Sequence, residues 1–420
     1  MSSAIANALS GLTANSTAIN VVSNNLANLN TTGYKDEQVS FEDLVNESIA
    51  GLASSTTISG STNAVGVQQF SQGTIETTGN PYDAAIQGGG FFVLQDPSSG
   101  QQLLTRQGNF TVNASGDLVT QSGQFVQGWK AVNGVLSTTG PVGNIALPTG
   151  LSLAPTATTA FSLNVNLNAN ATAGAADASF SSPVQVIDAQ GVSHTLTVTY
   201  TETAPNTWSY AVTIPSADLA AGGAGSTSLA SGTLSFNGAG QLTNPAAAAG
   251  GIPVAINNLA DGASNMNITW NLYDANGASL ITQDTATSAN LSSTQNGLQG
   301  GQLTGLSIGT NGVIVGTFSN GQTINVAQIA LASVTNPGSL EQFDGNSWVP
   351  TAATAAPVIG MPASGARGQI DGGALESSTV NIASEFTNLL EFERGYQANS
   401  KVVTTEDEIV QQTISLIANP

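Results

Sequence analysis

The sequence predicts a mainly β protein with a terminal α-helical coiled coil, in which a discontinuous β domain carries an inserted outer β domain. Three observations predict this class. Both ends of the chain carry narrow apolar stripes at helical spacing. The middle alternates short apolar runs with turns rich in Gly, Asn and Asp, as strands and hairpins do. Composition shifts near residues 156 and 289, and the segment between them has its own set of hairpin patterns.

The C-terminal residues 379–418 predict one long helix, because no proline interrupts them before Pro420. Apolar residues recur there at a spacing of seven, which on a slightly underwound helix keeps one seam facing partner helices. The predicted seam consists of Ile382, Leu389, Tyr396, Val403, Val410 and Ile417, widened by Phe386 and Ile414. Gly395 lowers helix stability, so we expect another chain to approach it closely.

Residues 2–29 predict a second helix, and Gly33 supplies a left-handed residue that can end it. Its apolar residues are Ile5, Leu9, Leu12, Ile19 and Leu26, and with Ser16 and Ser23 at the two positions between them the row alternates four and three apart. We interpret the two terminal helices as partners in a coiled coil that other subunits cover. The alternative is that both belong to the core of an ordinary globular domain, but the middle has few helix signals to build such a core.

The charge balance excludes several functions. The chain has 420 residues, with 26 acidic and 6 basic ones and a formal net charge of −20. Residues 131–366 contain no Lys or Arg, so nucleic acid and anionic membranes are poor partners. There is no cysteine and no apolar run of 18 residues, so we expect neither disulfides nor membrane insertion. The N-terminus lacks a secretory signal pattern, so we expect any export to use another route.

Four parts follow along the chain. We predict a helical domain from 1–35 and 375–420, a connector at 36–75, a middle β domain from 76–155 and 290–374, and an inserted outer β domain at 156–289. Within the connector, residues 41–50 suggest a short helix. The loops that start at Asp188 and Asp274 have the pattern of hairpin turns.

No arrangement in the sequence indicates catalysis, and we expect no cofactor and no metal site. The single histidine, His194, is predicted to be an exposed residue of a strand. The glycines at 88–90 lead into a strand and lack a following lysine, so they predict a structural turn, not a phosphate site. The loops at Asp188 and Asp274 offer one carboxylate each, which favours turn formation over calcium binding.

Three short stretches carry a family resemblance. Residues 23–35 read as a helix end, a glycine turn and an exposed aromatic, and they resemble the N-terminal motif of the axial proteins of the bacterial flagellum, the rod, hook and hook-associated proteins. Residues 388–401 resemble the companion C-terminal motif, and residues 79–93 a third shared stretch. The motif positions are Asn24, Asn25, Ala27, Asn28, Thr32, Gly33, Tyr34, Asn388, Tyr396, Gln397 and Asn399. Within this family, the length and residues 313–322 resemble hook proteins more than the shorter distal rod proteins.

The resemblance implies a structural role without enzymatic activity. It implies many copies in a curved, flexible helical tube that acts as a universal joint between rod and filament, on the cell surface as part of the hook and basal body. It also implies contacts with the distal rod protein, the hook cap, the hook–filament junction proteins and the flagellar export apparatus. The alternatives are a distal rod protein or, in a different class, a secreted β-rich enzyme or carbohydrate-binding module. Sedimentation of polymers discriminates the assembling proteins from the last class.

Overall fold

The computed structural model describes residues 2–45, 60–132, 134–148 and 150–418, of which 2–4, 42–45, 60–63 and 416–418 are described in backbone only. The chain divides into two compact units. The terminal unit contains Met1–Thr149, Gly305–Thr317 and Thr323–Pro420, and the inserted unit contains Gly150–Thr304 and Phe318–Gln322. Most described residues outside the two terminal helices lie in strands or turns, which confirms the predicted mainly β class with a helix at each end.

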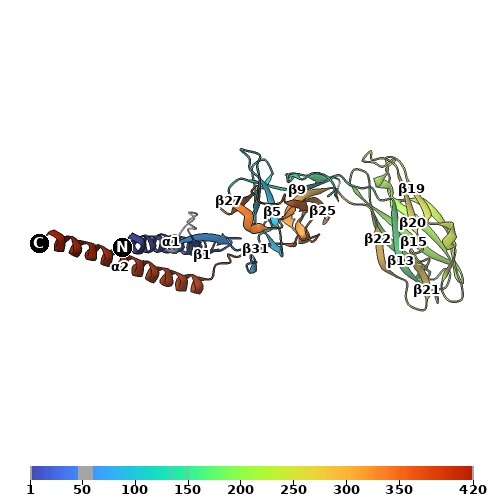
Figure 1. Ribbon diagram of the computed structural model, residues 1–420. Helices are drawn as coiled ribbons and strands as arrows, with labels where there is room; N and C mark the ends of the chain where they lie inside the picture. The colour runs from blue at the N-terminus through green and yellow to red at the C-terminus, as the bar shows by residue number, and fades with distance from the viewer. Residues whose placement is uncertain (1, 46–59, 133, 149, 419–420) are drawn as a thin grey trace. The chain divides into compact units, whose positions relative to one another are not determined.

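The two helices of the terminal unit, α1 (Ser2–Ala27) and α2 (Ile382–Ala418), run antiparallel, side by side, as Figure 1 shows. The side chain of Asn381 caps the N-terminus of α2. Its Oδ1 accepts hydrogen bonds from the N–H groups of Ala383 at 3.0 Å and Ser384 at 3.3 Å. This satisfies amides that a helix start leaves free. After α1 the chain turns at Gly33, whose φ of +66° is the left-handed value that was predicted. No helix among the described residues is long and apolar enough to cross a lipid bilayer.

A strand hairpin follows α1. Strands β1 (Glu37–Val45) and β2 (Gly60–Gln68) pair antiparallel, with Glu37 opposite Gln68. The predicted helix at 41–50 is therefore wrong for residues 41–45, and residues 46–50 lie outside the described part. Pairing with β2 and packing on α1 override the weak local helix pattern, as tertiary context commonly does. The ring of Phe41 also lies 5.8 Å from that of Phe392 on α2, so the hairpin contacts both helices.

The β part of the terminal unit combines strands from both halves of the chain. Its main sheet has the order β24-β25-β9-β5-β6-β28-β27, and β4 and β3 pair with β30 and β31 near the C-terminal helix. The strands are β3 Ile75–Thr77, β4 Ala84–Gln87, β5 Phe91–Gln95, β6 Gln102–Thr105, β7 Thr111–Val112, β8 Leu118–Val119, β9 Phe125–Val132, β10 Val135–Leu136, β11 Gly143–Asn144, β24 Val313–Phe318, β25 Thr323–Ile329, β26 Leu331–Ser333, β27 Leu340–Asp344, β28 Ser347–Pro350, β29 Val358–Gly360, β30 Gln369–Gly372 and β31 Ala374–Glu376.

Two apolar clusters hold these strands together. The larger one contains Phe92, Leu94 and Ile370, each with no exposed surface. The smaller one places the Trp348 ring edge-on to Phe91 at 5.7 Å. Because Ile370 comes from β30 and Phe92 from β5, the core joins segments that are far apart in the sequence. A hydrogen bond of 2.7 Å from Gly33 N–H to Glu376 O holds the turn after α1 close to the segment before α2.

The inserted unit is a sandwich of two sheets, ordered β19-β20-β13-β21 with β22 on β13, and β14-β15-β16-β17-β18. Its strands are β13 Ala160–Asn168, β14 Ser179–Ile187, β15 Ser193–Ala204, β16 Thr207–Pro215, β17 Ser226–Phe236, β18 Leu242–Asn244, β19 Ile252–Ile256, β20 Met266–Asn271, β21 Ile281–Asp284 and β22 Ala289–Gln295. Two further strands, β12 Ser152–Leu153 and β23 Gly301–Ile308, pair with each other outside these two sheets, and β23 begins in the inserted unit and ends in the terminal unit. Alternate residues of β16 are buried, as the pleat requires. The two sheets share one core, in which Trp270 stacks on Phe161 at 6.0 Å.

The two predicted Asp turns of the inserted unit are confirmed. Asp188 Oδ1 accepts hydrogen bonds of 2.8 Å from the N–H groups of Gln190 and Val192. Asp274 Oδ1 accepts equivalent bonds from Asn276 at 2.9 Å and Ala278 at 2.8 Å. The prediction for His194 is wrong: it is 5% exposed. Its strand position points the ring toward carboxylates of other loops, which the local sequence does not reveal.

Candidate assembly interface

On the face where the two helices meet, glycine and asparagine side by side allow a close approach at two points. A β-carbon at Gly11 would lie 2.7 Å from Asn399 Nδ2, and one at Gly395 would lie 2.6 Å from Asn15 Oδ1. Each asparagine also donates a hydrogen bond to the glycine carbonyl four residues before it in its own helix, Asn15 to Gly11 at 2.7 Å and Asn399 to Gly395 at 3.0 Å. The chain that approaches Gly395 is thus the protein's own α1, whereas the sequence predicted another chain.

The predicted seam does not coincide with this face. In α2, Ile382 and Tyr396 are 48% and 43% exposed, and Leu389, Val403 and Val410 are half-buried. In α1, Leu9 is 58% exposed, and Ile5, Leu12, Ile19 and Leu26 are half-buried. The side chain of Ile417 lies outside the described part. A straight helix drifts about 20° per heptad relative to a seven-residue repeat, so the row starts on the outward side and ends on the flank nearer α1.

As a result, α2 presents apolar side chains that the described part of its own chain does not cover. Phe386 is 52% exposed and Leu390 is 56% exposed, and with Ile382 they lie four residues apart on one side of the helix. We call these three residues, with Tyr396 and Ile414, the outward stripe. Scattered exposed apolar residues are ordinary, but a run along one helix marks a surface that a partner covers. Val402 and Ile409 are also exposed, on another side of α2.

An ionic junction ties the base of the helices to the β part of the terminal unit. It consists of Lys35, Arg106 and Glu376, all buried. Lys35 Nζ lies 2.6 Å from Glu376 Oε1, and Arg106 Nη1 lies 3.3 Å from Glu376 Oε2. Burial lowers the pKa of Lys35, although the Glu376 carboxylate acts in the opposite direction. The sequence analysis missed this junction; the scarcity of basic residues is the signal that could have drawn attention to Lys35 and Arg106.

The N-terminal motif residue Asn25 connects α1, β1 and α2. Its Oδ1 accepts hydrogen bonds from the hydroxyl of Tyr34 at 3.2 Å and from the N–H of Glu37 at 3.0 Å. Its Nδ2 donates to Glu37 O at 2.8 Å and to Glu385 Oε1 at 3.3 Å. Tyr34 is buried, which corrects the prediction of an exposed aromatic, and burial raises the pKa of its hydroxyl.

The other motif positions have less uniform surroundings. Gly33 donates its N–H to Glu376 O at 2.7 Å, and Thr32 O accepts a bond of 2.9 Å from Asn346. Asn28 donates to Asn24 O at 3.0 Å and so helps to end α1. Asn388 and Asn399 are half-buried, whereas Asn24, Ala27, Tyr396 and Gln397 are exposed.

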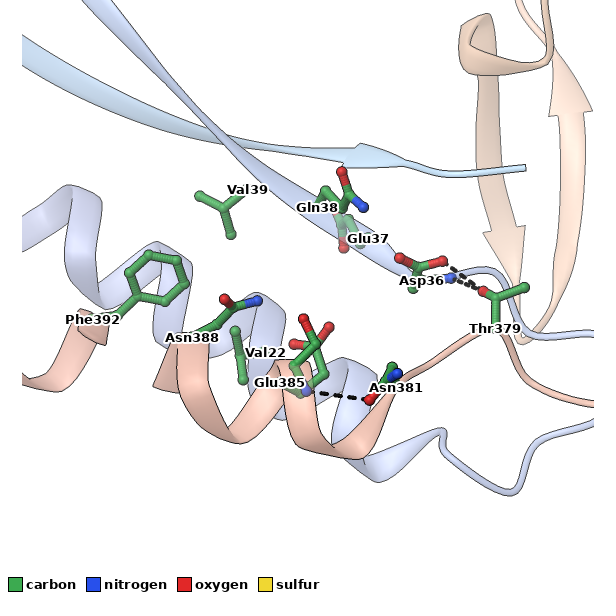
Figure 2. A pocket seen from close by; sticks show the side chains of 11 residues that line it. Val22, Asp36, Glu37, Gln38, Val39, Thr379, Asn381, Glu385, Asn388 and Phe392 are labelled. Atoms are coloured by element: carbon green, nitrogen blue, oxygen red, sulfur yellow. Dashed lines mark hydrogen bonds between the residues drawn. The ribbon is translucent and has the colours of Figure 1, made fainter. Parts of the chain in front are cut away.

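A polar groove of about 320 Å³ lies between β1 and the start of α2. Figure 2 shows the side chains that line it. Its lining includes the carboxylates of Asp36, Glu37 and Glu385 and contains no Lys, Arg, His or Cys. At one end, Thr379 donates a hydrogen bond of 2.6 Å to Asp36 Oδ1 and accepts one of 2.8 Å from Asp36 N–H. These residues fix the start of α2 on β1 and offer no nucleophile activated by a base.

Models of flagellar protein domains match most of the chain. They are the flagella basal body rod protein at residues 5–35, the flagellar hook protein FlgE/F/G D1 domain at 85–172, the flagellar basal body protein FlaE D2 domain at 164–298, and the flagellar basal body rod FlgEFG protein C-terminal at 371–416. Fold, terminal helices and these matches define an axial protein of the bacterial flagellum.

Among flagellar axial proteins, the relatives most similar in sequence include hook proteins. Flagellar hook protein FlgE of Escherichia coli (strain K12) is 32% identical over 98% of this chain and 100% of its own length. Flagellar hook protein FlgE of Salmonella typhimurium is 31% identical over 97% of this chain and 98% of its own. A crystal structure of Helicobacter pylori flagellar hook protein FlgE2 matches with a TM-score of 0.48 and 16% identity, over 65% of this chain and 93% of that one.

The chain belongs to the flagellar hook protein family, FlgE. It is a structural subunit of the flagellar hook, which is part of the basal body that extends outside the cell. The predicted family, function and location are confirmed.

Proposed function

We propose that the paired terminal helices are the polymerising element of this subunit, and that the outward stripe of α2 packs against the helices of other copies. The observation that carries the proposal is the exposure of Phe386 and Leu390, at 52% and 56%, on a helix already paired with α1. Burying a large apolar side chain contributes about 1.5–3 kcal/mol. Repeated over many copies, a stripe of this kind supplies a strong drive toward assembly.

The predicted parts have distinct roles in this proposal. Residues 1–35 and 375–420 form the inner tube, the middle β domain from 76–155 and 290–374 surrounds it, and the insertion at 156–289 faces outward. Residues 36–75 act as a connector, in which the β1–β2 hairpin contacts both helices. The many copies form a curved, flexible tube that acts as a universal joint and transmits torque from rod to filament. Family membership supports this arrangement.

Membership of this family also supports the remaining proposals. The subunit contacts the distal rod protein, the hook cap and the hook–filament junction proteins, and it leaves the cell through the flagellar export apparatus. Its role is structural and involves no catalysis. The low share of charged residues, 8%, suits a chain that packs against copies of itself, because like charges repel in a homopolymer.

Substitution of the outward stripe tests the polymerising role. In the variant Phe386→Ser/Leu390→Ser, we expect sedimentable tubes to disappear while the near-ultraviolet circular dichroism of the tryptophans, which lie outside the helices, stays unchanged. The control Ala398→Ser changes an exposed residue of the same helix and is expected to polymerise normally. Normal tubes from the double variant, seen by sedimentation and electron microscopy, would contradict the proposal.

A further inference from the structure

Four side chains of the inserted unit meet in a cluster that neither the hook function nor the assembly interface uses. The side chain of His194, on β15, is 6% exposed, and that of Asp188, in the turn before β15, is fully buried. Asp218 ends the short helix η2 (Ser216–Asp218), and Asp261 lies in the loop between β19 and β20. The three loops are already close, because Ala260 N–H donates to Asp218 O at 2.9 Å.

The two ring nitrogens of His194 have different surroundings. Nε2 lies 3.3 Å from Asp188 Oδ2 and 3.5 Å from Asp261 Oδ2. Nδ1 lies 3.2 Å from Asp218 Oδ2. If Nδ1 donates its hydrogen to Asp218, the Nε2 lone pair of a neutral ring faces two carboxylate oxygens. That juxtaposition is repulsive unless a cation lies between these atoms.

The backbone holds both of these carboxylates in place. Asp188 Oδ1 is occupied by the N–H groups of Gln190 and Val192, and Asp261 Oδ1 accepts a bond of 2.9 Å from Ala263 N–H. In each residue, Oδ2 is therefore left to face Nε2. One ligand atom from each of Asp188, His194 and Asp261 lies within 4.8 Å of the other two.

The local charge is unbalanced. Three carboxylates face one imidazole, so even a protonated ring leaves two negative charges without a partner. No Lys or Arg occurs between residues 131 and 366, a range that includes every residue of the inserted unit. Side chains of this unit therefore cannot supply the missing positive charge. Its absence is most costly at Asp188, whose side chain is fully buried, whereas those of Asp218 and Asp261 are 30% and 23% exposed.

We propose that Asp188, His194 and Asp261 form a zinc site, with Nε2 and the two Oδ2 atoms as ligands and a fourth position open to water. Bonds of about 2.0–2.2 Å in a tetrahedron place neighbouring ligand atoms about 3.3–3.6 Å apart. The measured separations of 3.3 and 3.5 Å from Nε2 fall in this range. A single nitrogen with carboxylates suits Zn²⁺, whereas Ca²⁺ and Mg²⁺ prefer six or more oxygen ligands.

Asp218 has the position of a residue that orients the ligand. Zinc-bound histidines almost always donate their other ring N–H to a carboxylate or carbonyl, which fixes the tautomer and the ring direction. Loss of such a partner typically weakens metal binding by about 10- to 100-fold. The bound ion then links the turn after β14, strand β15 and the loop after β19, with η2 joined through the Asp218–His194 hydrogen bond, and so stabilises that edge of the sandwich.

The test uses the full chain as an untagged monomer, freed of metal with a chelator. Zn²⁺ is titrated against a chromophoric competitor, and one equivalent is expected to bind. The variants His194→Gln and Asp261→Asn are expected to lose this binding, and Asp218→Asn to weaken it about 10- to 100-fold. Asp274→Asn is the matched control, because Asp274 forms the same kind of turn as Asp188 without a histidine nearby; it should bind like the wild type.

Two spectra report on the ligands directly. His194 is the single histidine, so its ring signals in a carbon–proton correlation spectrum are unambiguous and should shift with one equivalent of Zn²⁺. Co²⁺ in place of Zn²⁺ should give the intense visible absorption of a four-coordinate ion. Absence of stoichiometric binding, equal binding by His194→Gln and Asp261→Asn, or an unmoved histidine signal would overturn the proposal. Asp261→Asn keeps the test valid if His194→Gln does not fold, because Asp261 is partly exposed.

Discussion

Asn15 of α1 lies directly over Gly395 of α2, so that a β-carbon at position 395 would be 2.6 Å from Asn15 Oδ1. The reciprocal contact of Asn399 with Gly11 repeats this arrangement one turn along the pair. The contact sets how closely the two helices approach, and it leaves the large apolar residues of α2 on the outside. At these two contacts the helices are joined by small and polar groups, and apolar side chains of α2 such as Phe386 and Leu390 remain exposed.

Gly395→Ala is expected to weaken assembly. Alanine favours a helix by about 1 kcal/mol over glycine, but its β-carbon pushes Asn15 away and separates the helices. The double variant Gly395→Ala/Asn15→Ala removes the clash and should recover polymerisation. The critical protein concentration for sedimentation measures both. An alanine at 395 that polymerises as well as the wild type would show that this contact does not set the spacing.

Lys35→Met is expected to destabilise the terminal unit by about 3–5 kcal/mol, because removal of one partner of a buried ion pair leaves Glu376 less compensated. Urea unfolding of the monomer measures the change. The matched control is Lys130→Met, at an exposed lysine of β9, where a change within about 0.5 kcal/mol is expected. Equal effects at the two lysines would show that the ionic junction does not stabilise the terminal unit.

Glu385 predicts a pH dependence of stability. Burial raises the pKa of this carboxyl, Asn25 acts in the opposite direction, and Asp36 raises it further. Because the folded state holds this proton more tightly than the unfolded state, the contribution is present at low pH. It is lost as pH rises from the ordinary Glu value near 4.3 through the folded value.

The variant Glu385→Gln isolates that contribution. Its melting temperature should fall less than that of the wild type as pH rises from about 4 to 7, since glutamine does not titrate. Glu391→Gln, at an exposed position of the same helix, serves as the control and should follow the wild type. Parallel wild-type and Glu385→Gln curves would contradict the assignment.

The helices, the turns and the family could be predicted because each depends on local patterns. The repeat from Ile382 to Val410 marks α2, and Gly33 marks the end of the first helix region. The surfaces through which these elements contact one another could not be predicted from the sequence. A strict seven-residue repeat does not reveal that the side of α2 with Gly395 and Asn399 faces α1. The junction of Lys35 with Glu376 joins residues 341 positions apart.

The environment of His194 was hidden for the same reason. Its strand neighbours are polar, which predicts exposure, whereas Asp218 and Asp261 come from loops 24 and 67 positions further along the chain. The β1–β2 hairpin shows a related failure, because the apolar residues Phe41 and Leu44 fit a helix as well as a strand at this length. Pairing with residues 60–68 decides between them.

In the proposed assembly, other copies of the chain cover the outward stripe. Amide hydrogen exchange across α2 tests this most directly. The measurement compares the dilute monomer with assembled tubes over residues 382–418. We expect weak protection in the monomer, because a helix that buries little apolar surface is marginally stable. In tubes, exchange should slow by at least about 100-fold, since subunit contacts must first open. Strong, equal protection in monomer and tubes would show that the chain itself buries this helix, and would contradict the account.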